Sequence, residues 1–152
     1  MPICISVDHV LGLVEVLNSL GGRADASHIN EVTDVDADVL SHAIDLAEWL
    51  GLVKSVRGDL TLTDLGRDVA QSLHRGVLLK LKDRLIDIEP FKTIDSILRS
   101  RGRIEEEELT DLLKDIYGSD IVDDALNCIT GWGMYFRLFK YDPKTRIMVK
   151  SY

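Results

Sequence analysis

The chain has 152 residues, with 18 Lys and Arg against 26 Asp and Glu, and a formal net charge of −8. Residues 1–75 carry −7 of this charge and residues 76–152 carry −1. Because net negative charge repels nucleic-acid phosphates at long range, nucleic acid is disfavoured as a partner. No apolar run reaches the about 18 residues of a membrane-spanning helix, and residues 1–6 lack the features of a signal peptide. We therefore expect a cytoplasmic protein with no membrane span.

The spacing of apolar residues in the first half predicts three helices. Asp8 is the expected N-cap of the first helix and Asp25 that of the second. The third helix is expected to start at Asp36 or Asp38. Its predicted buried stripe consists of Leu40, Ala43, Ile44, Ala47 and Leu50.

A β-hairpin is predicted after these helices, over residues 52–62, because two short apolar runs flank the turn Arg57-Gly58-Asp59. Thr63 is the expected N-cap of a helix from residue 64 to about residue 73. The order helix, helix, helix, hairpin is typical of a winged helix, a variant of the helix-turn-helix.

The second half predicts the same order of elements after one connecting helix. Pro90 is expected in the first turn of the next helix, followed by a helix over residues 105–117 and one that Asp120 caps. Strands are predicted at residues 134–141 and 146–149, because the turn residues Asp142-Pro143-Lys144-Thr145 separate them.

Two sequence shifts relate the halves. A shift of 80 places Gly22-Arg23-Ala24-Asp25 on Gly102-Arg103-Ile104-Glu105, and a shift of 82 places the third helix on residues 121–133. A repeat of this length indicates one supersecondary unit used twice. We therefore predict a mostly α chain with small β-hairpins (α+β), made of two tandem winged-helix units: residues 1–75, a connecting helix at 76–89, and residues 90–152.

Several segments of the chain are similar to a known family, the AAA-associated C-terminal domain. The similar segments are His9–Leu13 with Gly21–Asp25, Leu62–Arg67, and Gly131–Tyr135 running into Leu138–Asp142. Members of this family typically follow the ATPase of nitrate/sulfonate/bicarbonate-type ABC transporters, mainly in archaea. The resemblance implies an accessory domain without catalytic residues. The chain has no Gly-x-x-x-x-Gly-Lys-Ser/Thr segment with which to cradle nucleotide phosphates.

The predicted outer faces of the two third helices argue against insertion into a DNA groove. A recognition helix contacts base edges through Arg, Lys, Asn or Gln. The predicted faces contain neither Lys nor Arg: they are Asp38, Ser41, His42, Asp45 and Glu48 in the first half, and Asp120, Asp123, Asp124, Asn127 and Thr130 in the second.

Two candidate contact sites remain. Five cations gather on the second predicted hairpin, where they would contact phosphate, anionic lipid or an acidic protein, or else pair with the chain's own acids. These candidate contact residues are Arg137, Lys140, Lys144, Arg146 and Lys150. The second candidate is an apolar seam that either forms a homodimer, like a short coiled coil, or packs within the chain. It consists of Leu78, Leu81, Leu85 and Ile88.

No arrangement of Ser, His and Asp, or of Cys and His, matches a catalytic spacing. Cys4 and Cys128 match no metal-ligand spacing, and we expect two free thiols. We therefore predict a protein that is not an enzyme and has no catalytic, cofactor-binding or metal-ligating residues. The leading hypothesis is a regulatory, protein-interaction module whose candidate partner is an ABC-type ATPase subunit. The alternatives are a winged-helix transcriptional regulator that contacts DNA through the basic second hairpin, and a sensor with a small-molecule pocket between the repeats.

Overall fold

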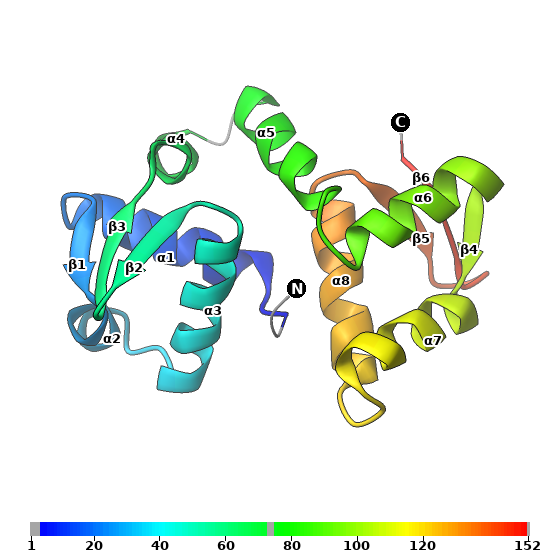
Figure 1. The fold of residues 1–152 in the computed structure, drawn as a ribbon, viewed down its shortest axis with the longest axis horizontal. Coiled ribbons are helices and arrows are strands. Elements are labelled where there is room, and N and C mark those ends of the chain that lie inside the picture. Colours follow the sequence, from blue (N-terminus) through cyan, green and yellow to red (C-terminus); the bar gives the residue numbers. More distant parts are fainter. Residues whose placement is uncertain (1–3, 73–74, 152) are drawn as a thin grey trace. The chain divides into compact units, whose positions relative to one another are not determined.

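The computed structural model of the chain describes residues 4–72 and 75–151. The chain forms two compact units, which divide between Leu78 and Leu79. Each unit combines several helices with one small antiparallel sheet of three strands (Figure 1). The predicted class, a mostly α chain with small β-hairpins, is confirmed.

The first unit runs from a long helix through a short strand and two further helices into a hairpin and a last helix. Its sheet has the strand order β1-β3-β2. The elements are α1 (Val7–Ser19), β1 (Arg23–Asp25), α2 (Ala26–Thr33), α3 (Ala37–Trp49), β2 (Val53–Val56), β3 (Asp59–Leu62) and α4 (Asp64–Gln71). The boundary between the units falls within α5 (Arg75–Leu85).

The second unit has the same order of elements up to its hairpin. Its sheet has the matching strand order β4-β6-β5. The elements are α6 (Phe91–Arg101), β4 (Arg103–Glu105), α7 (Glu106–Tyr117), α8 (Val122–Tyr135), β5 (Phe139–Asp142) and β6 (Ile147–Lys150).

The short strands β1 and β4 were not expected from the sequence, which predicted helix starts there. β1 pairs with β3, placing Arg23 opposite Thr61, and β4 pairs with β6, placing Arg103 opposite Val149. Three residues are too few to show the alternation that marks a strand. The hairpin in each unit is therefore part of a three-stranded sheet.

Equivalent positions at the ends of the two third helices, α3 and α8, differ by 86 in residue number. The predicted shift of 82 is wrong. In the first unit the N–H of Leu52 donates to the carbonyl of Ala47 at 2.9 Å, just beyond the end of α3. In the second unit the N–H of Leu138 donates to the carbonyl of Gly133 at 2.8 Å. The same bond therefore joins helix and hairpin in both units, four residues later than the apolar pattern suggested.

Three of the predicted N-caps are confirmed by their hydrogen bonds. Asp25 accepts from the N–H of Ser27 at 2.8 Å, and Asp36 accepts from the N–H of Asp38 at 2.8 Å. Thr63 accepts from the N–H of Gly66 at 3.0 Å. The helix after Thr63 ends at Gln71, and the predicted end near residue 73 lies outside the described residues.

Two of the predicted N-caps are wrong. α1 starts earlier than expected, with Ser6 as N-cap, so that Asp8 lies in its first turn. α8 starts after Ile121, and Asp120 is not its cap. In both places an acidic residue still lies beside a helix N-terminus, where the helix dipole favours negative charge.

The predicted strand at residues 134–141 is also wrong in its first half. α8 continues to Tyr135, because its buried apolar stripe continues through Trp132 to Phe136. The rings of Trp132 and Phe136 stack with their centroids 5.7 Å apart. In α3 the buried stripe includes Leu46, which is fully buried, in place of the predicted Ile44.

Two glycines allow close packing that any larger residue would prevent. A Cβ at Gly66 would lie 2.0 Å from the carbonyl oxygen of Leu52, and a Cβ at Gly133 would lie 1.9 Å from Cζ of Phe139. Phe139 is 2% exposed, so its ring has little room to move. Each glycine therefore sets the approach between a helix and the start of a hairpin.

The expectation of free thiols is wrong. Neither Cys4 nor Cys128 is free, and both are disulfide-bonded in the structure. The two cysteines therefore give no support to a reducing compartment.

None of the helices in the described part of the chain combines the length and the apolar character that crossing a bilayer requires.

We expect Gly133→Ala to destabilise the chain by about 1–3 kcal/mol, because overpacking displaces buried side chains. Gly131→Ala is the matched control in the same helix, since a Cβ there meets nothing within 4 Å. That change should be neutral or stabilising by up to about 1 kcal/mol, because alanine favours the helix. Urea unfolding followed by circular dichroism measures both. Equal effects of the two changes would contradict the packing argument.

The N-cap at Asp25 predicts that the stability of the folded chain depends on pH. Hydrogen bonds from the hydroxyl and the backbone N–H of Ser27 hold the pKa of Asp25 below its ordinary value of 3.8. A carboxyl group whose pKa is lowered by folding stabilises the folded chain when the pH is above the ordinary pKa. This stabilisation is lost as the pH falls through the pKa of the group in the folded chain. The wild-type chain should therefore be more stable than Asp25→Asn at pH 7, and the difference should vanish at strongly acidic pH. Thermal unfolding across pH measures it.

Candidate interaction surface

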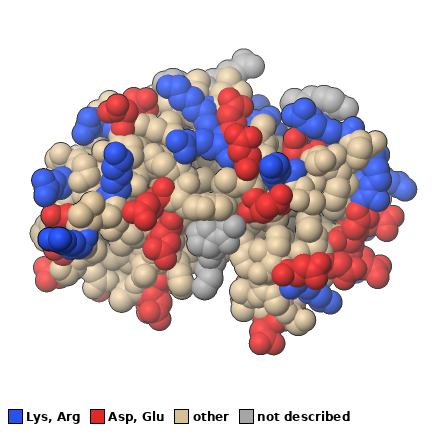
Figure 2. Space-filling model, in the orientation of Figure 1, with Lys and Arg blue, Asp and Glu red and all other residues tan. Residues whose placement is uncertain are grey.

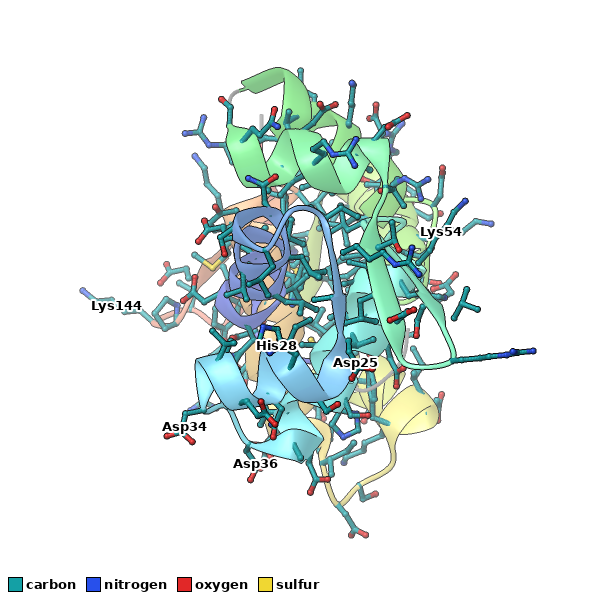
Figure 3. The ribbon with its side chains drawn as sticks, turned by 90° about the vertical axis from the view of Figure 1, so that its left-hand side faces the viewer. Asp25, His28, Asp34, Asp36, Lys54 and Lys144 are labelled. Atoms are coloured by element: carbon teal, nitrogen blue, oxygen red, sulfur yellow. The ribbon has the colours of Figure 1, made fainter. Side chains whose placement is uncertain are left out.

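The five predicted contact cations lie on or beside the hairpin formed by β5 and β6, which we call the second hairpin. Arg137 follows the end of α8, Lys140 lies on β5, and Lys150 on β6, while Lys144 and Arg146 lie in the connecting turn. All are exposed except Lys150, which is half-buried. Figure 3 shows Lys144 extending away from the ribbon. The second hairpin therefore presents four exposed cations.

The strand register extends this basic surface across the sheet. Arg103 on β4 lies opposite Val149 on β6, which in turn lies opposite Lys140 on β5. Residues that are opposite one another share a face of a sheet, and all three are exposed. The outer face of the second sheet therefore carries a row of Arg, Val and Lys.

The five cations of the second hairpin form no ion pair with any carboxylate in the part of the chain that the structure describes. In the first sheet, by contrast, the guanidinium of Arg23 lies 3.1 Å from the carboxylate of Asp59. Pairing with the chain's own acids thus does not account for the cations of the second hairpin.

Two of these cations have a backbone conformation that favours glycine. Arg137 has φ of 57° and Arg146 also has φ of 57°. The corresponding residues of the first unit are Gly51, with φ of 78°, and Gly58, with φ of 83°. For a residue with a side chain this left-handed region costs about 1–2 kcal/mol. The second unit therefore has arginine at two places where the fold would be less strained with glycine.

The opposite face of the second hairpin is fixed to α7. The hydroxyl of Tyr141 donates a hydrogen bond to the carboxylate of Glu106, and the N–H of Glu106 donates to the carbonyl of Arg146 at 2.9 Å. The hydrogen bond with Glu106, together with burial, raises the pKa of Tyr141 above its ordinary value. These contacts hold β5 and the turn in place.

A surface pocket of about 630 Å³ lies beside this contact, between the start of α7 and the turn of the second hairpin. Carboxylates outnumber cations in its lining, which consists of Glu105, Glu106, Glu107, Thr110, Asp111, Lys114, Thr145, Arg146 and Ile147. The pocket lies wholly within the second unit. The pocket was not predicted from the sequence, because its lining comes from two segments about 40 residues apart, which the pairing of β4 with β6 brings together.

The third helices carry exposed carboxylates, as their sequence predicts. Asp38, Asp45 and Glu48 of α3 are exposed, as are Asp123 and Asp124 of α8. Neither helix contains Lys or Arg. Figure 2 shows acidic and basic side chains interspersed on the visible face of each unit, so no continuous basic surface covers that face.

The acidic residues between α2 and α3 act at helix ends. Asp34 has a left-handed backbone at the C-terminus of α2, and Asp36 caps α3. In Figure 3 both side chains point outward. Across the described residues, no group of three or more His, Cys, Asp or Glu side chains is placed to hold a metal ion.

The apolar seam is largely covered within the chain. Leu81 and Leu85 are 2% and 0% exposed, and Leu78 is half-buried. Ile88, also half-buried, lies beyond the end of α5 in a turn. The side chains at the centre of the seam are therefore buried already, and a dimer through them stays a prediction.

Comparison with known proteins identifies a family. The sequence model of a family described as the C-terminal AAA-associated domain matches residues 27–142. No curated protein and no solved structure matches the chain at a significant level. The family is an accessory one, linked to AAA ATPases, and not a catalytic one. Since its match covers most of the sequence, the chain belongs to the C-terminal AAA-associated domain family.

Proposed function

We propose that the chain is a non-enzymatic, regulatory protein-interaction module that binds an ATPase subunit of an ABC-type transporter in the cytoplasm. The membership of an AAA-associated family supports an ATPase as partner. The observation that favours a protein partner over DNA is the charge of the third helices. Both have exposed carboxylates, and neither contains Lys or Arg.

The proposal treats each unit as a winged helix. In both units a helix, α3 or α8, is followed directly by a hairpin that pairs with an earlier short strand. In a winged helix that reads DNA, the third helix enters the major groove. Exposed carboxylates such as Asp38 and Asp123 would then approach phosphates, and each like-charge contact near a surface opposes binding by roughly 1 kcal/mol or more. A third helix with this charge is better suited to solvent or to a protein surface.

A second candidate function is that of a DNA-binding transcriptional regulator. The observation in its favour is the second hairpin, whose cations form no ion pair in the described residues. Phosphate contacts from such a hairpin would supply affinity without sequence preference.

We expect the chain to bind duplex DNA weakly and without sequence preference, and to lose this binding between about 50 and 200 mM salt, since phosphate contacts depend strongly on salt. Fluorescence anisotropy with labelled duplexes of differing sequence measures it. A tight complex that prefers one sequence at physiological salt would favour the transcriptional regulator and overturn the ATPase proposal.

We expect affinity capture from the native lysate, with the full chain as bait, to recover an ATPase subunit that mass spectrometry identifies. The double variant Lys140→Glu, Lys144→Glu should recover at least about tenfold less, because it reverses the charge of two exposed contacts. Lys92→Glu is the control, since it places the same change on the exposed side of α6. Capture of nucleic acid without any ATPase would contradict the proposal.

A further inference from the structure

The two sheets differ at one exposed edge. β2 is an edge strand of the first sheet and β5 is the corresponding edge of the second, since both sheets have the same strand order. An edge strand presents N–H and C=O groups that can pair with another chain, and proteins commonly block them. In the first sheet Glu48 provides such a block, because its carboxylate accepts a hydrogen bond from the backbone N–H of Ser55 at 2.8 Å.

The second sheet lacks this block. The correspondence of 86 residues places Met134 at the position of Glu48, and Tyr141 at that of Ser55. A methionine thioether is a weak acceptor and does not replace a carboxylate. Among the described residues, no side chain accepts a hydrogen bond from the N–H of Tyr141. The edge of β5 is therefore open.

The surroundings of this open edge are apolar at one end and carry three cations against one exposed carboxylate, Asp142, along the strand and its flanks. Met134 and Tyr135 are 46% and 43% exposed. Arg137 precedes β5, Lys140 lies on it, and Lys144 follows it in the turn. Because the left-handed backbone at Arg137 disfavours a side chain, an arginine there indicates a use for its charge.

We propose that β5 receives an extended, acidic segment of another protein as an added strand. Backbone hydrogen bonds to the open edge supply affinity, while contacts to alternate side chains supply specificity. Met134 and Tyr135 contact an apolar side chain of the segment, and the neighbouring cations contact its carboxylates. In the register that places Lys140 opposite Lys140, pairing of β5 with a second copy would bring like charges together. This inference rests on the proposed function and assigns the chemistry of the partner's segment.

The test uses the full chain and a fluorescein-labelled peptide of about eight alternating Val and Glu residues, long enough to extend beyond β5. We expect saturable binding by anisotropy. Met134→Glu should weaken peptide binding at least about tenfold. The new carboxylate would accept a hydrogen bond from the N–H of Tyr141, as Glu48 accepts one from the N–H of Ser55. Glu48→Met, the reciprocal control, should leave this binding in place. A Val and Lys peptide, and a Val and Glu peptide N-methylated at alternate residues, should not bind.

Arg137→Gly separates binding from folding. Since glycine occupies the corresponding position in the first unit, this variant should unfold at the same temperature as the wild type or higher. It should nevertheless bind the acidic peptide more weakly. Hydrogen exchange supplies a second readout: the N–H of Tyr141 should exchange faster than that of Ser55 in the free chain, and should become protected when the peptide is added.

Several results would overturn the inference. These are the absence of binding at about 1 mM peptide, unchanged binding by Met134→Glu, and equal binding of the Val and Lys peptide. A dimer that Met134→Glu dissociates would assign the edge to a second copy and would also overturn it. If the Met134→Glu variant still recovers the ATPase, the partner does not bind through the edge of β5, and the proposed function stands. Failure of the wild type to recover any ATPase would remove the proposed function instead.

Discussion

One backbone hydrogen bond in each unit fixes the relation between the third helix and the hairpin that follows it. Leu52 donates to Ala47 in the first unit, and Leu138 donates to Gly133 in the second. This bond lies where the chain leaves the third helix and enters the edge strand. It therefore sets the position of the hairpin relative to the helix. In the second unit, Gly133 also contacts the ring of Phe139 where a side chain would not fit. This junction therefore determines where the cations of the second hairpin lie.

Much of the fold follows from local sequence signals. Polar caps such as Thr63 and apolar stripes with helical spacing predict the helices, because they act over a few residues. The short strands β1 and β4 escaped prediction, since their pairing depends on hairpins about 40 residues away in the sequence. The junction after α8 was misplaced for a related reason. The buried pair of Trp132 and Phe136 extends the helix into a segment that is also typical of a strand.

The basic residues of the candidate surface were predictable, but their availability was not. The predicted strands and the turn between them placed Lys140 and Lys144 on a hairpin with little acidic charge nearby. Whether the chain's own carboxylates neutralise them depends on distances that only the folded structure supplies, and none does so among the described residues. The open edge of β5 was hidden for the same reason. It became visible once Met134 was matched with Glu48, which required the correct correspondence between the units.

The carboxylate of Glu48 has a consequence for stoichiometry. Two related halves could give a chain two equivalent places for a partner, and such a molecule would cross-link its partners into larger assemblies. On the proposal above, closure of the β2 edge by Glu48 would leave β5 as the only one of these two corresponding edges that receives a strand. The first unit would then serve as a scaffold and the second as an adaptor.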